Sequence, residues 1–498
     1  MLLSSVVKDL NFKKIKGGLN KTIRSVTYDS RKVVKESLFV AIQGFISDGH
    51  DYVNQAIKNG ANTIVVEKDL SIEDLDITVL KVTDSRDALA KISANFYQNP
   101  TEKMNLVGIT GTNGKTSISY FLKSIFEQNN KMTGVIGTNG TVFNNQSFKN
   151  DNTTPESSNL QEIFSEMLKF KVDTGIMEVS SHSLELKRVA YCKFNTAIFT
   201  NLSPDHLELH GDMENYFQAK AKLFDLTSDY NVINIDDTYG ARLVNKLKSN
   251  NKKVLTYGVE NNADIFASDI ELNEGYSVYT LNTPKNETVK VKVNMPGMIY
   301  VYNSLASVAC AYCNDISLLD IKKGIENVKN IQGRLEVVYQ EKDHKVVVDF
   351  AHTADSLEKA LKTLRPFTKG ELIVVFGVYA PPGNIGRDKR KSMGEVSAKY
   401  ADFSVVTSDN PKNQDPALII KEVGQAIKKA GGNFIEIVDR KKAIEYAIDM
   451  SGKSDTVLLA GKGHETSQVI GDKEIPFDER RIVKEYMEAI KAQSIPVD

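Results

Sequence analysis

A glycine-rich segment at residues 105–116, N-L-V-G-I-T-G-T-N-G-K-T, constrains the fold of this chain more than any other stretch. A short apolar run leads into three glycines, and the helical pattern S-I-S-Y-F-L-K-S-I-F follows after the threonine. Glycines at a strand-to-helix turn let backbone N–H groups close around a polyphosphate, and the helix N-terminus adds its dipole. Lys115 supplies a charge for the phosphates, and the Thr116 hydroxyl is suited to Mg²⁺. The segment therefore predicts a nucleotide-binding strand, loop and helix.

The spacing of this loop departs from the common phosphate-binding pattern, because five residues separate Gly108 from Gly114 where four are usual. The alternative interpretation is a tight turn that binds nothing. Lysine and threonine both stand where a nucleotide needs them, which favours the phosphate site.

Composition narrows the class of protein. A length of 498 residues predicts about three domains. The 63 basic and 64 acidic side chains nearly cancel, so we expect no nucleic-acid partner. No apolar run of about 18 residues is present, and the N-terminus lacks the pattern of a signal peptide, so we expect no membrane span and a cytoplasmic protein.

The three cysteines are too few for a disulfide framework, which also fits the cytoplasm. Cys310 and Cys313 form a C-x-x-C pair inside an apolar helical run. Because no second ligand pair follows, we interpret the two as buried packing residues rather than a redox or metal pair.

Strand and helix patterns alternate along the whole chain, which predicts an α/β protein of three units. Residues 1–102 form the first unit, which ends at the breaker N-P-T. Residues 103–330 open with the phosphate loop and predict a doubly wound sheet, followed by a β-rich stretch at 262–295 and a buried helix. Residues 331–498 alternate five strands with helices in a second, Rossmann-like pattern that lacks a phosphate loop.

Polar side chains follow predicted strands in the central unit. Glu178 and His206 each come just after an apolar run, and with Thr116 they offer oxygen and imidazole ligands for Mg²⁺. A helix that begins near residue 213 carries Lys220 and Lys222. These differ by two positions and so face different sides of the helix, although the pattern alone makes both ordinary surface lysines.

The third unit has its own polar groups at strand ends. Arg334 stands just after the unit begins, and Asp349 and His352 follow its first strand. An arginine from a neighbouring domain often neutralises a phosphoryl group in transfer. The segments S-D-N-P-K (408–412) and G-K-G-H-E (461–465) also follow strands; the first is a turn, and the second is a candidate helix start.

Near the N-terminus, the polar stretch Y-D-S-R at residues 28–31 precedes the first strand predicted in this unit. It is suited either to an anionic ligand or to capping a helix, and the pattern leaves the two interpretations open.

Taken in order, these motifs resemble the Mur ligases of the MurE type, the UDP-N-acetylmuramoyl-tripeptide synthetases of peptidoglycan synthesis. The resemblance covers essentially all 498 residues. It rests on D-S-R-K-V, D-G-H, G-I-T-G-T-N-G-K-T, N-T-T-P, M-E-V-S-S-H, T-N-L-S-P-D-H-L-E-L-H-G, Y-F-Q-A-K-A-K-L-F, G-R-L-E-V-V, V-D-F-A-H-T-A-D-S-L, S-D-N-P-K and G-K-G-H-E.

The resemblance implies a three-domain, ATP-dependent amide ligase that acts on UDP-MurNAc-L-Ala-D-Glu and a diamino acid. ATP would phosphorylate the terminal D-Glu carboxylate, and the α-amine of the third amino acid would then attack the acyl phosphate and expel phosphate. Positioning and charge neutralisation do most of this catalysis. Closure of the third domain would exclude water. We expect a monomer that requires Mg²⁺.

The resemblance also assigns residues to roles. The catalytic set is Lys115, Lys220, Arg334 and His352. The ATP-binding set is Gly111, Thr112, Asn113, Gly114, Lys115, Thr116, Ser117, Asn303, Arg334 and Asp349. The UDP-substrate set is Ser30, Asn152, Thr153, Thr154, Ser180 and Arg188, and the amino-acid set is Arg387, Asp409, Asn410, Pro411, Lys412, Gly461 and Glu465. The metal ligands would be Thr116, Glu178, His206 and Lys220, the last as the family's carbamylated lysine, which replaces the surface role assigned above.

Three departures from the family pattern stand out. Tyr300 replaces the first asparagine of G-x-x-N-x-x-N, although Gly297 and Asn303 remain. Residues 378–386 are longer than usual and carry two prolines, which affects the register of Arg387.

The third departure bears on the amino acid that is added. Lys412 stands where relatives that add meso-diaminopimelate usually carry arginine. A cation attracts the distal carboxylate of diaminopimelate and repels the ammonium of lysine, so we favour meso-diaminopimelate over L-lysine.

Two other readings of the sequence remain as alternatives. One is another Mur-type ligase, either the D-Ala-D-Ala-adding enzyme or a folylpolyglutamate synthetase; D-N-P-K and G-K-G-H-E argue against the first, and the N-terminal D-S-R-K-V against the second. The other is a non-catalytic nucleotide-binding scaffold, which would bind ATP without releasing phosphate.

Overall fold

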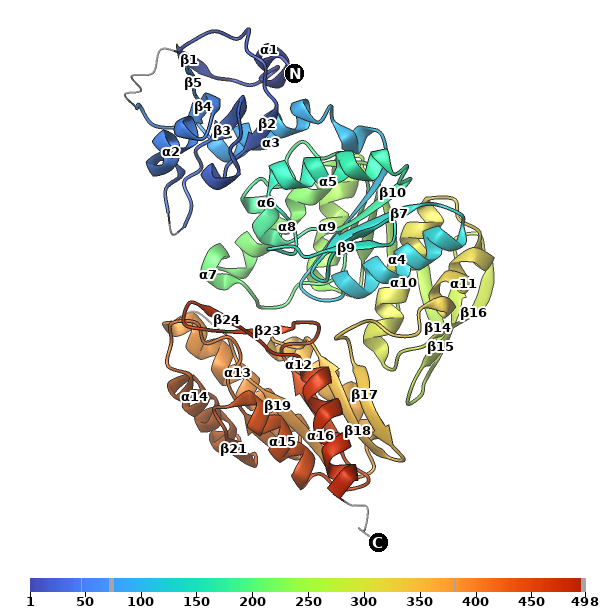
Figure 1. The fold of residues 1–498 in the computed structure, drawn as a ribbon. Coiled ribbons are helices and arrows are strands. Elements are labelled where there is room, and N and C mark those ends of the chain that lie inside the picture. The colour runs from blue at the N-terminus through green and yellow to red at the C-terminus, as the bar shows by residue number, and fades with distance from the viewer. Residues whose placement is uncertain (46, 71–75, 380–381, 494–498) are drawn as a thin grey trace.

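The structure, a computed structural model, describes residues 1–45, 47–70, 76–379 and 382–493. The chain forms three bodies, which follow one another from the blue N-terminal end to the red C-terminal end in Figure 1. Within the described residues their main sheets contain five, eleven and six strands. The α/β fold in three units predicted from the sequence is confirmed, and each of these sheets lies inside one of the predicted units.

The first body is a small sheet in the order β1-β5-β4-β3-β2, in which only β1 runs antiparallel to its neighbour. Its strands are β1 (Lys13–Lys16), β2 (Ser25–Thr27), β3 (Ser37–Val40), β4 (Ala61–Val66) and β5 (Thr78–Lys81). Its helices are α1 (Leu3–Val6), η1 (Ser30–Lys32), η2 (Gly49–Tyr52), α2 (Val53–Lys58) and α3 (Ser85–Phe96), and η3 (Pro100–Glu102) leads into the next body. The Asp29 side chain accepts a hydrogen bond from the Arg31 backbone N–H, which confirms the capping interpretation of residues 28–31.

The central body is built on one long sheet in the order β16-β15-β14-β13-β12-β11-β6-β10-β7-β8-β9. Its strands are β6 (Asn105–Thr110), β7 (Thr133–Gly137), β8 (Gly140–Phe143), β9 (Gln146–Phe148), β10 (Thr174–Glu178), β11 (Phe194–Phe199), β12 (Thr227–Asn234), β13 (Lys253–Gly258), β14 (Ile265–Leu272), β15 (Ser277–Asn282) and β16 (Thr288–Val293). Its helices are α4 (Lys115–Gln128), α5 (Ser157–Lys169), α6 (Ser181–Glu185), α7 (Leu207–His210), α8 (Met213–Asp225), α9 (Thr238–Ser249), α10 (Met298–Cys313) and α11 (Leu318–Asn327).

The order of the central strands positions the site. β6, which leads into the glycine loop, lies between β10 and β11, and all three run parallel. The segments that follow these strands therefore meet at one edge of the sheet, where open α/β sheets bind ligands. The β-rich stretch predicted at 262–295 is confirmed as β14, β15 and β16, which extend the same sheet through antiparallel pairs.

Helix α10 packs beside α4 and covers strands β12, β13 and β14, while α4 covers β6, β7 and β10. The apolar side chains of α10 belong to the largest core cluster, together with those of β6 and α4. Cys310 is fully buried in this core and Cys313 is packed against it, so the packing interpretation of the C-x-x-C pair is confirmed.

The third body has a six-stranded sheet in the order β17-β18-β22-β19-β20-β21, parallel except for the pair β17–β18. Its strands are β17 (Glu336–Glu341), β18 (His344–Asp349), β19 (Leu372–Phe376), β20 (Phe403–Val406), β21 (Phe434–Glu436) and β22 (Thr456–Ala460), and β23 (Ser467–Ile470) pairs with β24 (Lys473–Pro476) as a separate hairpin. Its helices are α12 (Ala354–Leu364), η4 (Arg365–Phe367), α13 (Asn384–Tyr400), α14 (Pro416–Lys429), α15 (Arg440–Met450) and α16 (Glu479–Gln493).

The helix start suggested for G-K-G-H-E is wrong. Residues 461–465 form a turn that leads into β23. Gly461 and Gly463 have φ angles of 114° and 53°, which a right-handed helix does not allow. Elsewhere in the described residues, no helix combines the length and the apolar character that crossing a membrane requires.

Candidate active site

The glycine loop makes close approaches that only glycine permits. Gly111 has φ 146°, and a Cβ there would collide with the Thr200 hydroxyl at the end of β11. Gly114 has φ 94°, and a Cβ there would collide with the Asn303 amide oxygen from α10. The loop is therefore clamped between two neighbouring elements, with α4 starting directly after it.

Two lysines, the half-buried Lys115 and the buried Lys220, meet at this loop. The Lys115 ammonium donates to the carbonyl oxygens of Gly111 at 2.8 Å and Thr112 at 2.9 Å. The Lys220 ammonium, from α8, donates to the same Gly111 oxygen at 2.9 Å and lies over the Tyr216 ring. Burial lowers the pKa of both lysines, and for Lys220 the charge of Lys115 lowers it further.

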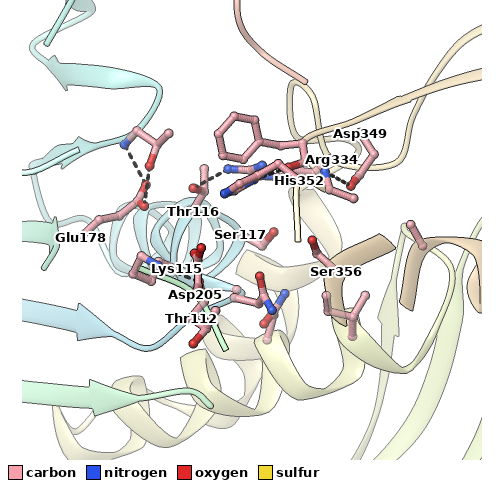
Figure 2. A pocket seen from close by; sticks show the side chains of 18 of the residues that line it. Thr112, Lys115, Thr116, Ser117, Glu178, Asp205, Arg334, Asp349, His352 and Ser356 are labelled. Carbon is pink, nitrogen blue, oxygen red and sulfur yellow. Dashed lines mark hydrogen bonds between the residues drawn. The ribbon is translucent and has the colours of Figure 1, made fainter. Parts of the chain in front are cut away.

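A buried carboxylate forms the opposite wall. Glu178, at the end of β10, accepts hydrogen bonds from the Thr138 backbone N–H at 3.1 Å and the Thr138 hydroxyl at 2.9 Å. The Thr138 hydroxyl also lies 3.2 Å from the Thr153 hydroxyl. These bonds fix the carboxylate at the cavity edge, on the opposite side of Thr116 from Arg334 in Figure 2.

The third domain supplies the other wall. The Arg334 guanidinium donates to the Thr116 hydroxyl at 2.8 Å and stacks on the Phe350 ring. Burial raises the pKa of Asp349, whose carboxylate accepts from the backbone N–H groups of Leu335 and Ala351. Asp349 therefore holds the segment that carries Arg334 in position.

These walls enclose one cavity of about 290 Å³ between the central and third domains. Six of the seven predicted loop residues line it, all except Gly111. Other predicted site residues in the lining are Thr153, Glu178, Ser180, His206, Asn303, Arg334, Asp349 and His352. The remaining lining residues are Thr138, Asp205, Ile299, Tyr300, Leu335, Phe350, Ala351, Ser356 and Ala360. The structure thus brings together six of the predicted loop residues, Arg334 and three of the four predicted metal ligands, whereas Lys220 lies behind the loop at the Gly111 carbonyl oxygen.

His352 of the third domain and Asp205 of the central domain line the same cavity. Burial lowers the pKa of His352 to about 4, and its Nδ1 lies 2.8 Å from the Phe350 carbonyl oxygen. Burial raises the pKa of Asp205, but His206 and Lys389 outweigh it and keep that pKa below its usual range. Lys389 comes from α13 of the third domain and lies 3.7 Å from the Asp205 carboxylate.

A second contact ties the third domain to the loop itself. The Asp355 carboxylate, in the first turn of α12, accepts from the Asn113 amide at 2.6 Å and from the Ser203 hydroxyl at 3.3 Å. Lys359 donates to the same oxygen from one turn further along the helix. Because Asn113 belongs to the glycine loop, this contact joins the loop directly to α12.

The predicted UDP-substrate residues are divided between two places. Thr153 and Ser180 line the cavity. The Thr154 hydroxyl accepts a hydrogen bond from the Ser180 backbone N–H, and the Thr154 carbonyl oxygen accepts one from the Arg188 guanidinium. Asn152 instead lines a separate pocket of about 450 Å³ with Tyr28, and Ser30 is buried in η1 of the first domain.

The predicted amino-acid residues form a polar cluster in the third domain. The buried Lys462 ammonium binds Glu465 at 2.8 Å, Asn410 at 3.1 Å and Asp409 at 3.4 Å. The cluster is fixed by the Gly461 N–H, which donates to the Asp349 carbonyl oxygen.

Three further members of that set lie around the cluster. Pro411 is buried, and Lys412 is exposed and contacts Tyr379. The Arg387 side chain is 68% exposed on α13, with Glu422 as its ion-pair partner at 3.8 Å. The structure therefore does not bring Arg387 to the cluster.

The metal-binding candidates fit Mg²⁺ by their chemistry. Thr116, Glu178 and His206 line the same cavity, and the Glu178 carboxylate is buried. In the described part of the chain, no three His, Cys, Asp or Glu side chains converge closely enough to hold an ion alone. Mg²⁺ typically takes only one or two protein carboxylates and completes its shell with phosphate oxygens and water, so this sparse set is suited to it.

The sequence analysis missed five residues of the site region. They are Thr138, Asp205, Asp355, Tyr379 and Lys462. Asp205 stands next to His206 in T-N-L-S-P-D-H-L-E-L-H-G, and Asp355 stands three residues after His352 in V-D-F-A-H-T-A-D-S-L, so adjacency to a predicted site residue was the available signal. Thr138 and Tyr379 carry no such signal.

The fold and the cavity define a multidomain α/β protein, in which a glycine loop with the lysine and threonine typical of phosphate sites meets an arginine from the next domain. Family models agree: "Mur ligase family, catalytic domain" matches residues 22–97, "Mur ligase middle domain" residues 109–311, and "Mur ligase, glutamate ligase domain" residues 333–463. The chain belongs to the Mur ligase family, whose members form amide bonds at the expense of ATP.

Individual proteins extend this similarity over the whole chain. A UDP-N-acetylmuramoyl-L-alanyl-D-glutamate–2,6-diaminopimelate ligase of Caldanaerobacter subterraneus subsp. tengcongensis is 45% identical over 95% of this chain and 96% of its own. The ligase of the same name from Clostridioides difficile is 43% identical over 98% of this chain and 99% of its own. A solved structure of a ligase with that name has 27% identity, covers 100% of both chains and superposes with a TM-score of 0.68. The MurF ligase of Thermotoga maritima in complex with ADP shares the fold, with a TM-score of 0.65. It is 18% identical, and the match covers 95% of this chain and 99% of that one.

Proposed function

We propose that this protein uses ATP to join meso-diaminopimelate to UDP-MurNAc-L-Ala-D-Glu through an acyl phosphate, with Mg²⁺ at the phosphates. One observation carries the proposal: Lys115 and Thr116 of the glycine loop share a single cavity with Glu178 and with Arg334 of the third domain. A transferring phosphoryl group needs charge neutralisation from several directions at once, and this cavity supplies it.

The chain's own residues account for the first step. The loop N–H groups, the Lys115 ammonium and the Arg334 guanidinium hold and neutralise the β- and γ-phosphates. Thr153 and Ser180, on the Glu178 side of the cavity, orient the D-Glu carboxylate toward the γ-phosphorus. A carboxylate oxygen then bonds to phosphorus while the bond to the ADP oxygen breaks, so no protein nucleophile is required.

The second step forms the amide. The neutral amine nitrogen of the incoming amino acid bonds to the acyl carbon, the carbon–oxygen bond to phosphate breaks, and the proton lost from nitrogen leaves with the released phosphate. The third domain closes the cavity through Arg334, Asp355 and Lys389, which excludes the water that would hydrolyse the acyl phosphate.

Thr116, Glu178 and His206 would hold Mg²⁺, which when bound supplies positive charge to the phosphate oxygens. Lys220 would act as a carbamate. Its burial beside Lys115 favours the neutral amine, the form that adds to CO₂. The addition forms a nitrogen–carbon bond and releases one proton, which turns a cation into an anion.

The test is phosphate release with UDP-MurNAc-L-Ala-D-Glu and ATP, run separately with meso-diaminopimelate, L-lysine and L-ornithine. We expect meso-diaminopimelate to give the highest kcat/KM. Faster turnover with L-lysine would overturn the choice of amino acid but not the ligase reaction. ATP binding without phosphate release under any of the three conditions would favour the scaffold alternative.

A further inference from the structure

The turn that carries Lys412 is hydrogen-bonded to the β23–β24 hairpin. The Lys412 backbone has φ 51°, and its N–H donates to the Val469 carbonyl oxygen at 3.3 Å. The Gly471 N–H donates back to the Lys412 carbonyl oxygen at 2.8 Å. The side chain therefore projects from a fixed point beside the Asp409, Asn410 and Lys462 cluster.

The Lys412 ammonium meets a tyrosine rather than an acid. Its Nζ lies 3.0 Å from the Tyr379 hydroxyl, to which it donates, and 4.5 Å from the centre of the Tyr379 ring. Within the described residues, no carboxylate lies within ion-pair distance of this ammonium, whereas Lys462 nearby pairs with both Glu465 and Asp409. Lys412 thus carries a positive charge that the surrounding side chains do not neutralise.

Lys412 and Tyr379 together offer two neighbouring hydrogen-bond donors. A tyrosine hydroxyl that accepts from an ammonium still has its own proton to donate. The Lys412 Nζ and the Tyr379 oxygen, 3.0 Å apart, can therefore each donate to one oxygen of the same carboxylate. Arginine does this alone through its planar fork, whereas lysine by itself is a point charge.

Contacts connect this pair to the reaction cavity. Asn410 donates to Glu465 at 3.3 Å, in the turn that also carries His464. The His464 ring packs against Phe350, which in turn stacks on Arg334. A substrate that spans this path would place one end at the Lys412 turn and the other near the phosphates.

We propose that Tyr379 is a specificity-determining residue, which completes with Lys412 a two-pronged donor for the carboxylate at the far end of the incoming amino acid. This inference rests on the proposed function, because it concerns the amino acid that the ligase adds. The pair selects a side chain that ends in a carboxylate and disfavours one that ends in an ammonium, since the site already holds an unneutralised cation.

The experiment is steady-state kinetics with meso-diaminopimelate as the varied substrate, for Tyr379→Phe and for the double variant Tyr379→Phe/Lys412→Arg. Tyr379→Phe keeps the ring beneath the ammonium and removes only the hydroxyl. We expect it to raise KM for meso-diaminopimelate about tenfold, the usual effect of losing a hydrogen bond to a charged group, with kcat and KM for ATP within about twofold of wild type. Tyr446→Phe, an exposed tyrosine on α15, is the matched control and should change nothing.

The double variant separates a recognition role from a structural one. Arginine restores both donors without the tyrosine hydroxyl, so KM should return to within about threefold of the wild-type value. An unchanged KM in Tyr379→Phe would overturn the inference while the ligase assignment stands. A wild-type enzyme that prefers L-lysine would overturn the inference together with the proposed amino acid, and the phosphate-release assay identifies that case separately.

Discussion

Lys115 and Lys220 donate to the same atom, the carbonyl oxygen of Gly111, although 105 positions separate them in the sequence. Two ammonium groups on one oxygen repel each other, and burial removes the water that would screen them. The arrangement favours loss of one charge, and Lys220 is the lysine whose pKa Lys115 lowers. The geometry therefore suits a Lys220 that carries an anionic carbamate beside a cationic Lys115.

Lys220→Ala tests this relationship. We expect kcat to fall by about 10²–10³, the typical effect of removing one group that stabilises transition-state charge. Added acetate or formate should restore part of the activity by replacing the anion. Lys222→Ala is the control on the same helix, because that exposed lysine pairs with Glu185 on the surface, and its kinetics should match the wild type. Equal losses in the two variants would contradict the assignment.

Arg334→Lys tests the arginine delivered by the third domain. Its guanidinium reaches the Thr116 hydroxyl while stacking on Phe350, and lysine reproduces neither the fork nor the stacking. We expect kcat to fall by about 10²-fold or more with ATP affinity reduced less, as for arginines that act in phosphoryl transfer. Single-turnover phosphate release and ATP binding by calorimetry measure the two effects. A variant that loses only ATP affinity would argue for a binding role alone.

Asp355→Ala tests the contact between the third domain and the glycine loop. The variant leaves Asn113 and Ser203 without their shared acceptor. We expect KM for ATP to rise about tenfold, because the loop is no longer held in its closed form. Glu358→Ala on the same helix, where the carboxylate pairs with Lys362, is the control and should leave KM unchanged. No change in Asp355→Ala would mean that the contact does not position the loop.

The pH dependence of stability has a predicted sign. The pKa of His352 is about 4 in the folded protein against an ordinary 6.5, so between these values the unfolded chain binds more protons. The contribution of His352 to the free energy of unfolding is therefore complete above pH 6.5. As the pH drops toward 4, the free energy of unfolding should fall by about 1–3 kcal/mol. Urea unfolding from pH 7 to pH 4 measures it. In His352→Gln, the free energy of unfolding should change less steeply with pH. The same pH dependence in the variant and the wild type would show that His352 does not contribute.

Much of the fold was predictable because its signals are local. The strand, glycine loop and helix at residues 105–128 follow from an apolar run, three glycines and helical spacing that all lie within one segment. Five of the six strands in the main sheet of the third domain, β18 to β22, were predicted for the same reason, whereas β17 was not. Strand β1 was missed, because K-K-I-K is an exposed edge strand whose lysines do not look like a strand.

The site was only partly predictable, because its decisive contacts are long-range. The sequence predicted that Lys220 and Lys222 lie on different faces of α8 but did not show which of them faces inward. In the structure Lys220 is the buried one and packs over the Tyr216 ring. The Asp355 contact with Asn113 and the Tyr379 contact with Lys412 join segments 242 and 33 residues apart, for which one sequence gives no signal.

Isotope transfer from the D-Glu carboxylate tests the central claim most directly. UDP-MurNAc-L-Ala-D-Glu labelled with ¹⁸O in that carboxylate is turned over with ATP and meso-diaminopimelate, and the released phosphate is analysed by mass spectrometry. The acyl phosphate route predicts one ¹⁸O atom in each phosphate, because the carbon–oxygen bond breaks when the amine attacks. Phosphate free of ¹⁸O, with amide product still formed, would contradict the account.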